Sequence, residues 1–238
     1  RTPLNTINNA LVQMRDATRA EDRQALQDYV QSSAERLSTQ VENVVMLVES
    51  GYASIVPQYR LFFIAPLIER ARRVAGNLLL NKPVDLIVES HGQSHAAYLG
   101  DEYLLFRFLM PVLSNACQYT EHGAVSVQLD LGDTAIDIAI SDTGPGISPE
   151  HQKIIFERFT QLSTGYQRTH EGLGIGLAVC QRIGKLLGAT LKLESTPGFG
   201  SRFYLHVPVQ AMAGVAAPAN TALAGHALIV EDNEVNAA

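Results

Sequence analysis

The sequence predicts an α+β fold, with a helical hairpin followed by a two-layer α/β sandwich built on a mixed sheet. Near the N-terminus, apolar residues recur every three or four positions, which is the period of an amphipathic helix. Beyond about residue 60, such patterns alternate with the every-second-residue pattern of half-buried strands. The 238 residues carry a net charge of −6, which argues against direct contact with nucleic acid or an anionic membrane.

Residues 1–52 are expected to form the hairpin. Its first helix has a seam of Leu4, Ile7, Leu11 and Met14, and the second has one of Leu26, Val30, Ser33, Leu37, Gln40, Val44 and Leu47. A helix of roughly 40 Å buries such a stripe only against a partner, so two hairpins are expected to form a four-helix bundle in a homodimer. Ser33 and Gln40 either fix the register of this seam or lie at a wet end of the bundle.

Residues 60–209 are expected to form the sandwich, with three main helices over about five strands. The expected helices are 65–80, 101–119, a short one at 153–159, and 173–187; the expected strands are 84–89, 125–131, 136–140, 191–194 and 202–207. Gly132 and Asp133 are expected to turn the chain between the second and third strands.

The C-terminal residues differ in composition from the sandwich. Residues 210–224 are small and nearly uncharged, which is typical of a linker. Residues 225–238 contain an apolar run that ends in Glu231 and Asp232, and they are expected to be the first strand of a further domain. The chain begins at Arg1 without an initiator methionine, so we expect it to be part of a longer protein.

Three clusters suggest binding of a polyphosphate ligand. Asp142, Gly144 and Gly146 follow a strand, where a carboxylate accepts a hydrogen bond and glycines allow a ligand to approach the backbone. Residues 172–176, Gly-Leu-Gly-Ile-Gly, open a helix whose free N–H groups favour an anion. Asn115 carries an amide oxygen that suits Mg²⁺, although a lone helical asparagine is more often a surface residue. A fourth cluster, residues 198–201, is ordinarily a β-turn.

In chain order, these clusters resemble the N, G1, F, G2 and G3 boxes of the histidine kinase ATP-binding domain, a member of the GHKL (Bergerat) superfamily shared with gyrase, Hsp90 and MutL. Leu113-Ser114-Asn115-Ala116 with Tyr119-Thr120 resembles the N box, and residues 142–147 the G1 box. Ile155-Phe156-Glu157-Arg158-Phe159 resembles the F box, and residues 172–177 the G2 box. Five motifs in register over about 90 residues make the resemblance specific.

The resemblance extends beyond the ATP-binding boxes. Arg1-Thr2-Pro3-Leu4 resembles the end of the family's H box, which places the phosphoacceptor histidine three residues before Arg1 and outside this chain. Thr2 falls at the position that orients water for phosphatase activity; its alternative role is simply the end of a helical turn before Pro3. Residues 228–236 resemble the first strand of a receiver domain, with Glu231 and Asp232 as its Mg²⁺-binding pair. Together these features imply a hybrid sensor histidine kinase of two-component systems.

The resemblance implies a role for each site residue. Asp142 would select the adenine of ATP, Asn115 would hold Mg²⁺, and the glycine-rich G2 backbone would cradle the phosphates under a lid of residues 160–171. Arg168 in that lid would reach the γ-phosphate, although a single charge on a polar loop is more often solvated. The nucleotide-binding residues implied are Asn115, Tyr119, Asp142, Gly144, Gly146, Ile147, Phe159, Gly172, Leu173, Gly174, Ile175, Gly176, Leu177 and Ser201.

Two positions depart from the family pattern. Pro111 stands where the N box usually has a second asparagine, and a proline inside a helix costs ~3 kcal/mol or more unless the helix kinks. Such a kink would re-aim Asn115. Gln118 replaces a lysine that usually contacts phosphate. The intact glycine boxes favour nucleotide binding, whereas these two losses argue against fast turnover.

Two functions of different classes follow from the sequence. The first is a working hybrid histidine kinase that phosphorylates its H-box histidine and passes the group to a receiver aspartate in cis or in trans. The second is a weakly active or inactive kinase that regulates another sensor kinase by forming a heterodimer through the hairpin. A gyrase-type or chaperone-type ATPase is disfavoured, because it has no place for an H box or a receiver. The resemblance implies that such a chain is the cytoplasmic portion of a bacterial sensor protein anchored in the inner membrane.

Overall fold

A computed structural model describes residues 8–14, 55–92, 96–160 and 174–212, together with positions 23, 26, 27, 30, 34, 37, 41 and 215. In the N-terminal part, residues 8–14 are helical, and so are the single described positions from 23 to 41. Leu26, Val30 and Leu37 of the expected seam are half-buried, whereas Leu11 is 46% exposed in the isolated chain. The pairing of two hairpins into a bundle stays a prediction.

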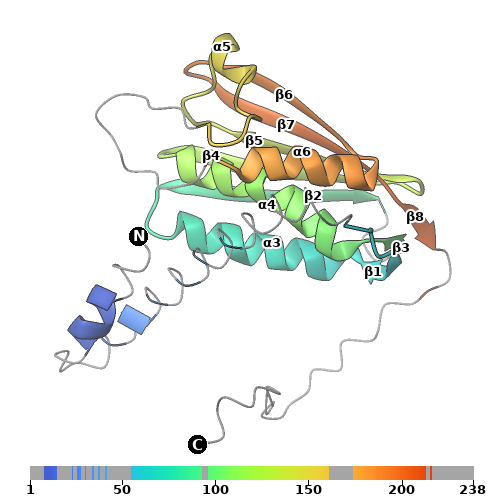
Figure 1. Ribbon diagram of the computed structural model, residues 1–238, viewed down its shortest axis with the longest axis horizontal. Helices are drawn as coiled ribbons and strands as arrows, with labels where there is room; N and C mark the ends of the chain where they lie inside the picture. The colour runs from blue at the N-terminus through green and yellow to red at the C-terminus, as the bar shows by residue number, and fades with distance from the viewer. Residues whose placement is uncertain are drawn as a thin grey trace, which may run out of the picture.

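The rest of the described chain is a two-layer α/β sandwich, as predicted. Five strands form one mixed sheet in the order β2-β4-β5-β7-β6, in which β2 and β4 are parallel and the other neighbours antiparallel. These strands are β2 (Val84–Gly92), β4 (Gly123–Leu131), β5 (Ala135–Asp142), β6 (Thr190–Thr196) and β7 (Gly200–Pro208). Helices α3 (Ile64–Leu79), α4 (Glu102–Tyr119) and α6 (Gly176–Leu187) lie on one face of this sheet (Figure 1).

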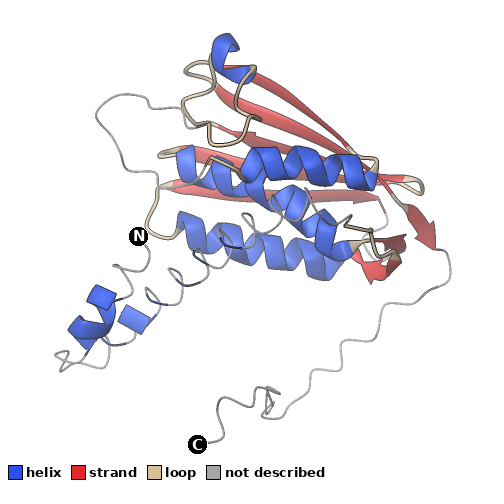
Figure 2. Ribbon diagram, in the orientation of Figure 1, coloured by secondary structure: helices blue, strands red, loops and turns tan. Residues whose placement is uncertain are grey.

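Alternation along the strands decides which face of the sheet is buried. Every second residue of β4 and β5 points into the core, including the fully or nearly fully buried Leu129, Ile136, Ile138 and Ile140. The opposite face carries polar side chains that bond across strands, as Gln128 does with Glu89 at 3.4 Å and with Arg202 at 3.0 Å. Figure 2 shows the helices gathered on the other side, so the core is a single layer between sheet and helices.

A small second sheet was not predicted from the sequence. Strands β1 (Arg60–Phe63), β3 (Ala97–Gly100) and β8 (Gln210–Met212) pair in the order β1-β3-β8, all antiparallel. The range expected to be a linker, 210–224, therefore begins in a strand, because Ala211 N donates to Asp133 O at 2.7 Å and the strand pairs with β3. No periodic signal marks strands of three or four residues whose partners lie far along the chain.

Two predicted helix boundaries were wrong. The short helix is α5 (Pro149–Gln152), not residues 153–159. Ser148 caps it, with its side chain accepting from His151 N, and Pro149 follows at the first helical position, a start signal that the apolar pattern of 154–156 outweighed in the prediction. Helix α6 begins at Gly176, not at 173, because Gly174 has a φ of +64°, which a helix does not allow.

Both cysteines are core residues without a disulfide. Cys117 on α4 and Cys180 on α6 are fully buried, and burial raises the pKa of both thiols, that of Cys117 to about 12. The Cys180 thiol donates to the carbonyl oxygen of Phe108 at 3.0 Å, which joins α6 to α4. Neither thiol is set up to react as a thiolate.

The Tyr98 hydroxyl is a buried polar group with no hydrogen-bond partner among the described residues. Burial and the nearby charge of Asp133 raise its pKa, so it remains a neutral phenol. We expect Tyr98→Phe to leave the free energy of unfolding unchanged or to raise it by up to about 1 kcal/mol, because no bond is lost. Urea unfolding of both chains measures this; a loss of more than about 1 kcal/mol would show that the hydroxyl is bonded.

Candidate functional site

The G1 cluster lies where β5 ends at one edge of the sandwich. Asp142 is the last residue of β5 and pairs with Val125 of β4 and Ser201 of β7. Its half-buried carboxylate accepts from Gly144 N at 2.9 Å. Burial raises the pKa of this carboxyl, against the opposing effect of the Gly144 and Ser201 N–H groups. The result is a partly desolvated hydrogen-bond acceptor at the end of β5.

Two glycines of this cluster lie against the backbone of other elements, and at Gly146 the contact leaves no room for a side chain. A Cβ at Gly146, where φ is +68°, would overlap the carbonyl oxygen of Thr196 at the end of β6. A Cβ at Gly144 would lie 3.2 Å from the carbonyl oxygen of Tyr119, the last residue of α4. The loop after β5 is therefore held between the ends of β6 and α4, and the N and G1 boxes lie side by side.

Helix α4 carries the N-box residues and is stabilised at its first turn. Asp101 caps the helix by accepting from Leu104 N at 2.9 Å, and its other oxygen accepts from Gln58 N at 2.7 Å. At the other end, Asn115 is half-buried and Tyr119 is 42% exposed, with burial raising the pKa of the tyrosine. The buried Thr120 hydroxyl donates to Ala116 O at 2.7 Å and closes the last turn.

Lys82 stabilises the last turn of α4, a role that the sequence analysis missed. Its Nζ donates to the carbonyl oxygens of Cys117 at 2.8 Å, Gln118 at 2.9 Å and Thr120 at 3.2 Å. The helix has no basic residue of its own in that turn, so Lys82 supplies the positive charge that a helix C-terminus favours. No local signal predicts this, because Lys82 lies in the loop between α3 and β2, 35 to 38 residues earlier.

Pro111 does not end α4, which is helical from Glu102 to Tyr119. The proline faces the start of α6, since a Cβ on Gly176 would lie 3.4 Å from the Cβ of Pro111. The N-box departure therefore contacts the helix start that belongs to the G2 box. Pro111 therefore lies at the contact between α4 and α6, and a substitution there would affect the packing of these two helices.

The residues on either side of 161–173 lie close together near the start of α6. A Cβ on Gly174 would lie 2.5 Å from the carbonyl oxygen of Thr160, which brings together the residues on either side of 161–173. Next along the chain, Ile175 is 3% exposed and anchors the start of α6. Phe159 at the other end has a φ of +63° and is 72% exposed. The start of α6 therefore lies close to Thr160.

The structure places Ser201 beneath the G1 loop. Ser201 is 8% exposed, and its Oγ lies 3.0 Å from the Oγ of Ser195. Ile147 and Leu177 are half-buried at the rim and pack against the core. The predicted residues Thr2, Arg168, Gly172, Leu173, Glu231 and Asp232 lie outside the described residues.

The groups placed along α4 are of the kinds that suit a nucleotide. A partly desolvated carboxylate and closely packed glycine backbone lie near its last residue, and the N-terminus of α6 lies near Pro111; such groups suit an amino group and an anion. Among the described residues, no three His, Cys, Asp or Glu side chains group as a metal site. A cation here would depend on the Asn115 amide and on the oxygens of its own phosphate ligand.

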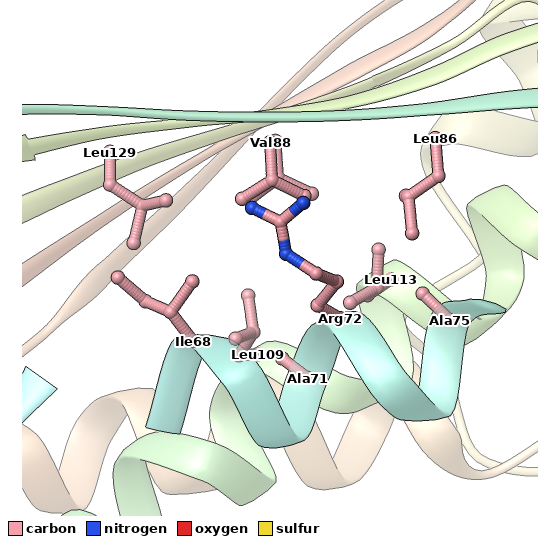
Figure 3. Close-up of a pocket in the computed structure, with 10 residues that line it drawn as sticks. Ile68, Ala71, Arg72, Ala75, Leu86, Val88, Leu109, Leu113 and Leu129 are labelled. Carbon is pink, nitrogen blue, oxygen red and sulfur yellow. The ribbon is translucent and has the colours of Figure 1, made fainter. Parts of the chain in front are cut away.

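A hollow lies between α3 and the sheet, and Leu113 of the N box is among the residues that line it. Figure 3 shows its lining of aliphatic side chains from α3, α4, β2 and β4, with Arg72 extending from α3 toward Val88. The Arg72 side chain is 48% exposed, and its Nε lies 3.7 Å from Glu69 Oε2, one turn earlier on α3. With no acidic or glycine-rich lining, this hollow lacks the groups that recognise a nucleotide.

We expect Lys82→Met to lower the free energy of unfolding by about 1–3 kcal/mol, because three carbonyls at the end of α4 lose a charged donor. Lys192→Met is the matched control: this exposed lysine lies on the outer face of β6, and its change should stay within about 0.5 kcal/mol. Urea unfolding compares them. Equal stability of the two variants would contradict the role of Lys82.

We expect Asp142→Asn to raise the unfolding temperature at neutral pH. Burial raises the pKa of Asp142 in the folded chain, so ionising it costs stability at neutral pH, and an amide avoids that cost. The stabilisation that protonation provides is fully present below the unfolded pKa and is lost as pH rises through the folded pKa. The gain in the variant should therefore shrink on acidification; a gain independent of pH would contradict this assignment.

Comparison with known proteins confirms the family that the sequence resembles. Residues 100–211 match the family described as histidine kinase-, DNA gyrase B- and HSP90-like ATPases. The sensor histidine kinase AruS of Pseudomonas aeruginosa is 32% identical over 99% of this chain, and the sensor protein EvgS of Escherichia coli K12 is 33% identical over 71% of it. The chain spans 24% of the first and 14% of the second.

A solved structure shares the fold over most of the chain. Full-length ShkA, crystallised in complex with AMPPNP, superposes with a TM-score of 0.65 and 25% identity, covering 91% of this chain and 44% of ShkA. Of the helices in the described ranges, none has both the length and the apolar character needed to cross a membrane. Residues 100–211 are therefore an ATP-binding domain of the histidine kinase-, DNA gyrase B- and HSP90-like family, in a chain homologous to sensor histidine kinases.

Proposed function

We propose that this chain is the kinase core of a hybrid sensor histidine kinase, which binds ATP with Mg²⁺ and transfers the γ-phosphoryl group to a histidine just upstream of Arg1. One observation carries the proposal: helix α4 packs against the loop that carries the Asp142 carboxylate at Tyr119 and against the start of α6 at Pro111, so the N, G1 and G2 boxes lie along one helix. The homology to sensor histidine kinases supports it. A receiver aspartate, in cis or in trans, takes the phosphoryl group next.

Each side of the site has its own task in this proposal. The Asp142 carboxylate accepts from the adenine amino group, and burial makes that bond selective because a mismatched donor or acceptor stays unpaired. The backbone at Gly174 and Gly176 donates to the phosphates at the start of α6. Asn115 holds Mg²⁺, which neutralises phosphate charge. Catalysis of phosphoryl transfer is chiefly positioning, so these residues act through geometry.

Residues outside the described ranges complete the proposal. Thr2 orients water in the reverse, phosphatase reaction, and Arg168 reaches the γ-phosphate from the lid. Glu231 and Asp232 bind Mg²⁺ once the receiver is complete. The hairpin of residues 1–52 makes the homodimer, and the whole assembly lies on the cytoplasmic side of a membrane-anchored bacterial sensor protein.

A second function, regulation of another sensor kinase with little activity of its own, is favoured by the N box. Pro111 packs toward Gly176 and offers no ligand to a cation. The charge missing at Gln118 is not replaced by Lys82, whose ammonium is bonded to three carbonyls. In this function the exposed seam residue Leu11 would face a different sensor kinase in a mixed dimer.

Calorimetric titration of the chain with ATP and Mg²⁺ tests the binding step. We expect the parent to bind and Asp142→Asn to bind at least about tenfold more weakly, because the variant loses a charged acceptor while remaining folded. Gln128→Asn on the outer sheet face is the control and should bind like the parent. Absence of binding by the parent would contradict the kinase proposal and leave the regulatory function.

Restoring the family residues tests turnover. In a longer chain that includes the H-box histidine, we expect Pro111→Asn with Gln118→Lys to increase ATP-dependent labelling of that histidine, because a metal ligand and a phosphate contact return. Gln128→Lys adds the same charge on the outer sheet face and should leave labelling unchanged. Labelling absent from both parent and restored chain, with a stable mixed dimer, would favour the regulatory function.

A further inference from the structure

A second layer of hydrogen bonds lies directly behind the loop that follows β5. It comes from Ser195, near the end of β6, and Gln152, the last residue of α5. Neither residue belongs to the N, G1, F or G2 boxes. Both bond to the same peptide segment at Ile147, the residue that ends the G1 box.

The Ser195 hydroxyl uses its whole hydrogen-bonding capacity in this layer. It accepts from Ile147 N at 2.8 Å and donates to the carbonyl oxygen of Gly200 at 2.9 Å. Since a hydroxyl has one proton, its contact with Ser201 Oγ at 3.0 Å must be donated by Ser201. One oxygen atom therefore joins the G1 loop to the start of β7.

The Gln152 side chain bonds the same two segments from the other side. Its Nε2 donates to Ile147 O at 2.7 Å and to Ser195 O at 3.0 Å. The side-chain amide thus donates both of its hydrogens, one to a carbonyl of the loop and one to a carbonyl of β6. Ile147 has its N–H bonded to Ser195 and its C=O bonded to Gln152, so its peptide groups are fixed on both sides.

The segments joined in this way also surround Asp142. A Cβ on Gly200 would overlap the carbonyl oxygen of Asp142, and the Ser201 N–H acts on its carboxyl. A further backbone bond, Gly198 N to Pro145 O at 2.8 Å, fixes the middle of the loop to the β6–β7 turn. Ser195 is therefore connected to Asp142 in two ways. It bonds to Ile147 in the loop that follows Asp142, and it bonds to Gly200, which packs against the Asp142 backbone.

We propose that Ser195 and Gln152 are positioning residues for nucleotide recognition, which set the loop after β5 and thereby the orientation of the Asp142 carboxylate toward the base. This rests on the proposed function. Neither residue touches the ligand; both act through Ile147. Loss of either leaves the loop free to shift, which weakens the bond to the base more than it weakens the fold.

The test compares Ser195→Ala, Ser195→Thr and Gln152→Leu with the parent by titration with ATP and with GTP in the presence of Mg²⁺. We expect Ser195→Ala and Gln152→Leu each to weaken ATP binding about three- to tenfold and to reduce the preference for ATP over GTP. Ser195→Thr retains the hydroxyl and should recover most of the affinity. Gln128→Leu, a glutamine that also makes two side-chain bonds but on the outer sheet face, should change neither quantity.

A double variant separates positioning from general destabilisation. Because both residues fix one peptide segment, the combined loss in Ser195→Ala with Gln152→Leu should be smaller than the product of the single losses. Amide exchange at Ile147 in the ligand-free chain should rise in both single variants while exchange in the core strands β4 and β5 stays slow.

The outcomes distinguish this inference from the function on which it rests. Failure of the parent to bind ATP would overturn the proposed function and the positioning role with it. Tight binding by the parent with unchanged affinity and base preference in both single variants would overturn only the positioning role. Independent losses in the double variant, or equal losses in Gln128→Leu, would overturn it as well.

Discussion

The close packing of the loop after β5 against the turn between β6 and β7 is the constraint on which the site depends. Backbone meets backbone there, since side chains on Gly146 or Gly200 would overlap the carbonyl oxygens of Thr196 and Asp142. Because β5 and β7 are neighbours in the sheet, the contact continues their ladder beyond its last pair, Asp142 and Ser201. A rigid sheet edge therefore extends into the binding loop, and the carboxylate is held where burial raises its pKa.

Helix α4 connects this edge to the rest of the core. It begins at the Asp101 cap, which also binds Gln58 N, and it ends where Lys82 bonds three carbonyls. The Asp101 cap bonds to the chain before α3, and Lys82 comes from the loop between α3 and β2, so both ends of α4 are fixed by distant parts of the chain. These contacts also fix where Asn115 and Tyr119 lie. Small residues on α6 allow a close approach to α4, as at Gly184, where a Cβ would lie 3.1 Å from the Phe108 ring.

Several features of the candidate site lower the stability of the fold. A half-buried carboxylate with a raised pKa and several separate glycines with positive φ are unfavourable in a small domain. They are offset by hydrogen bonds from Ser195 and Gln152, which lie outside the recognised boxes. Thr143 of the G1 box adds two more, since its hydroxyl accepts from Ala124 N at 3.0 Å and donates to His122 O at 3.0 Å. The motif residues can therefore keep their polar groups for a ligand.

The sequence by itself determined the class of fold, the main helices and strands, and the residues of the glycine boxes, because alternation and helical periodicity are local and Asp142, Gly144 and Gly146 stand together in the chain. It also predicted α4, whose start at Asp101 is a local cap. The tertiary structure alone decided the β1-β3-β8 sheet, the start of α6, the Lys82 contacts, the bond between Ser195 and Ile147 and the bond between Gln152 and Ser195. The start of α6 depends on one backbone angle, at Gly174. The other features join residues far apart in the chain, and they form only when the packed core brings the segments together.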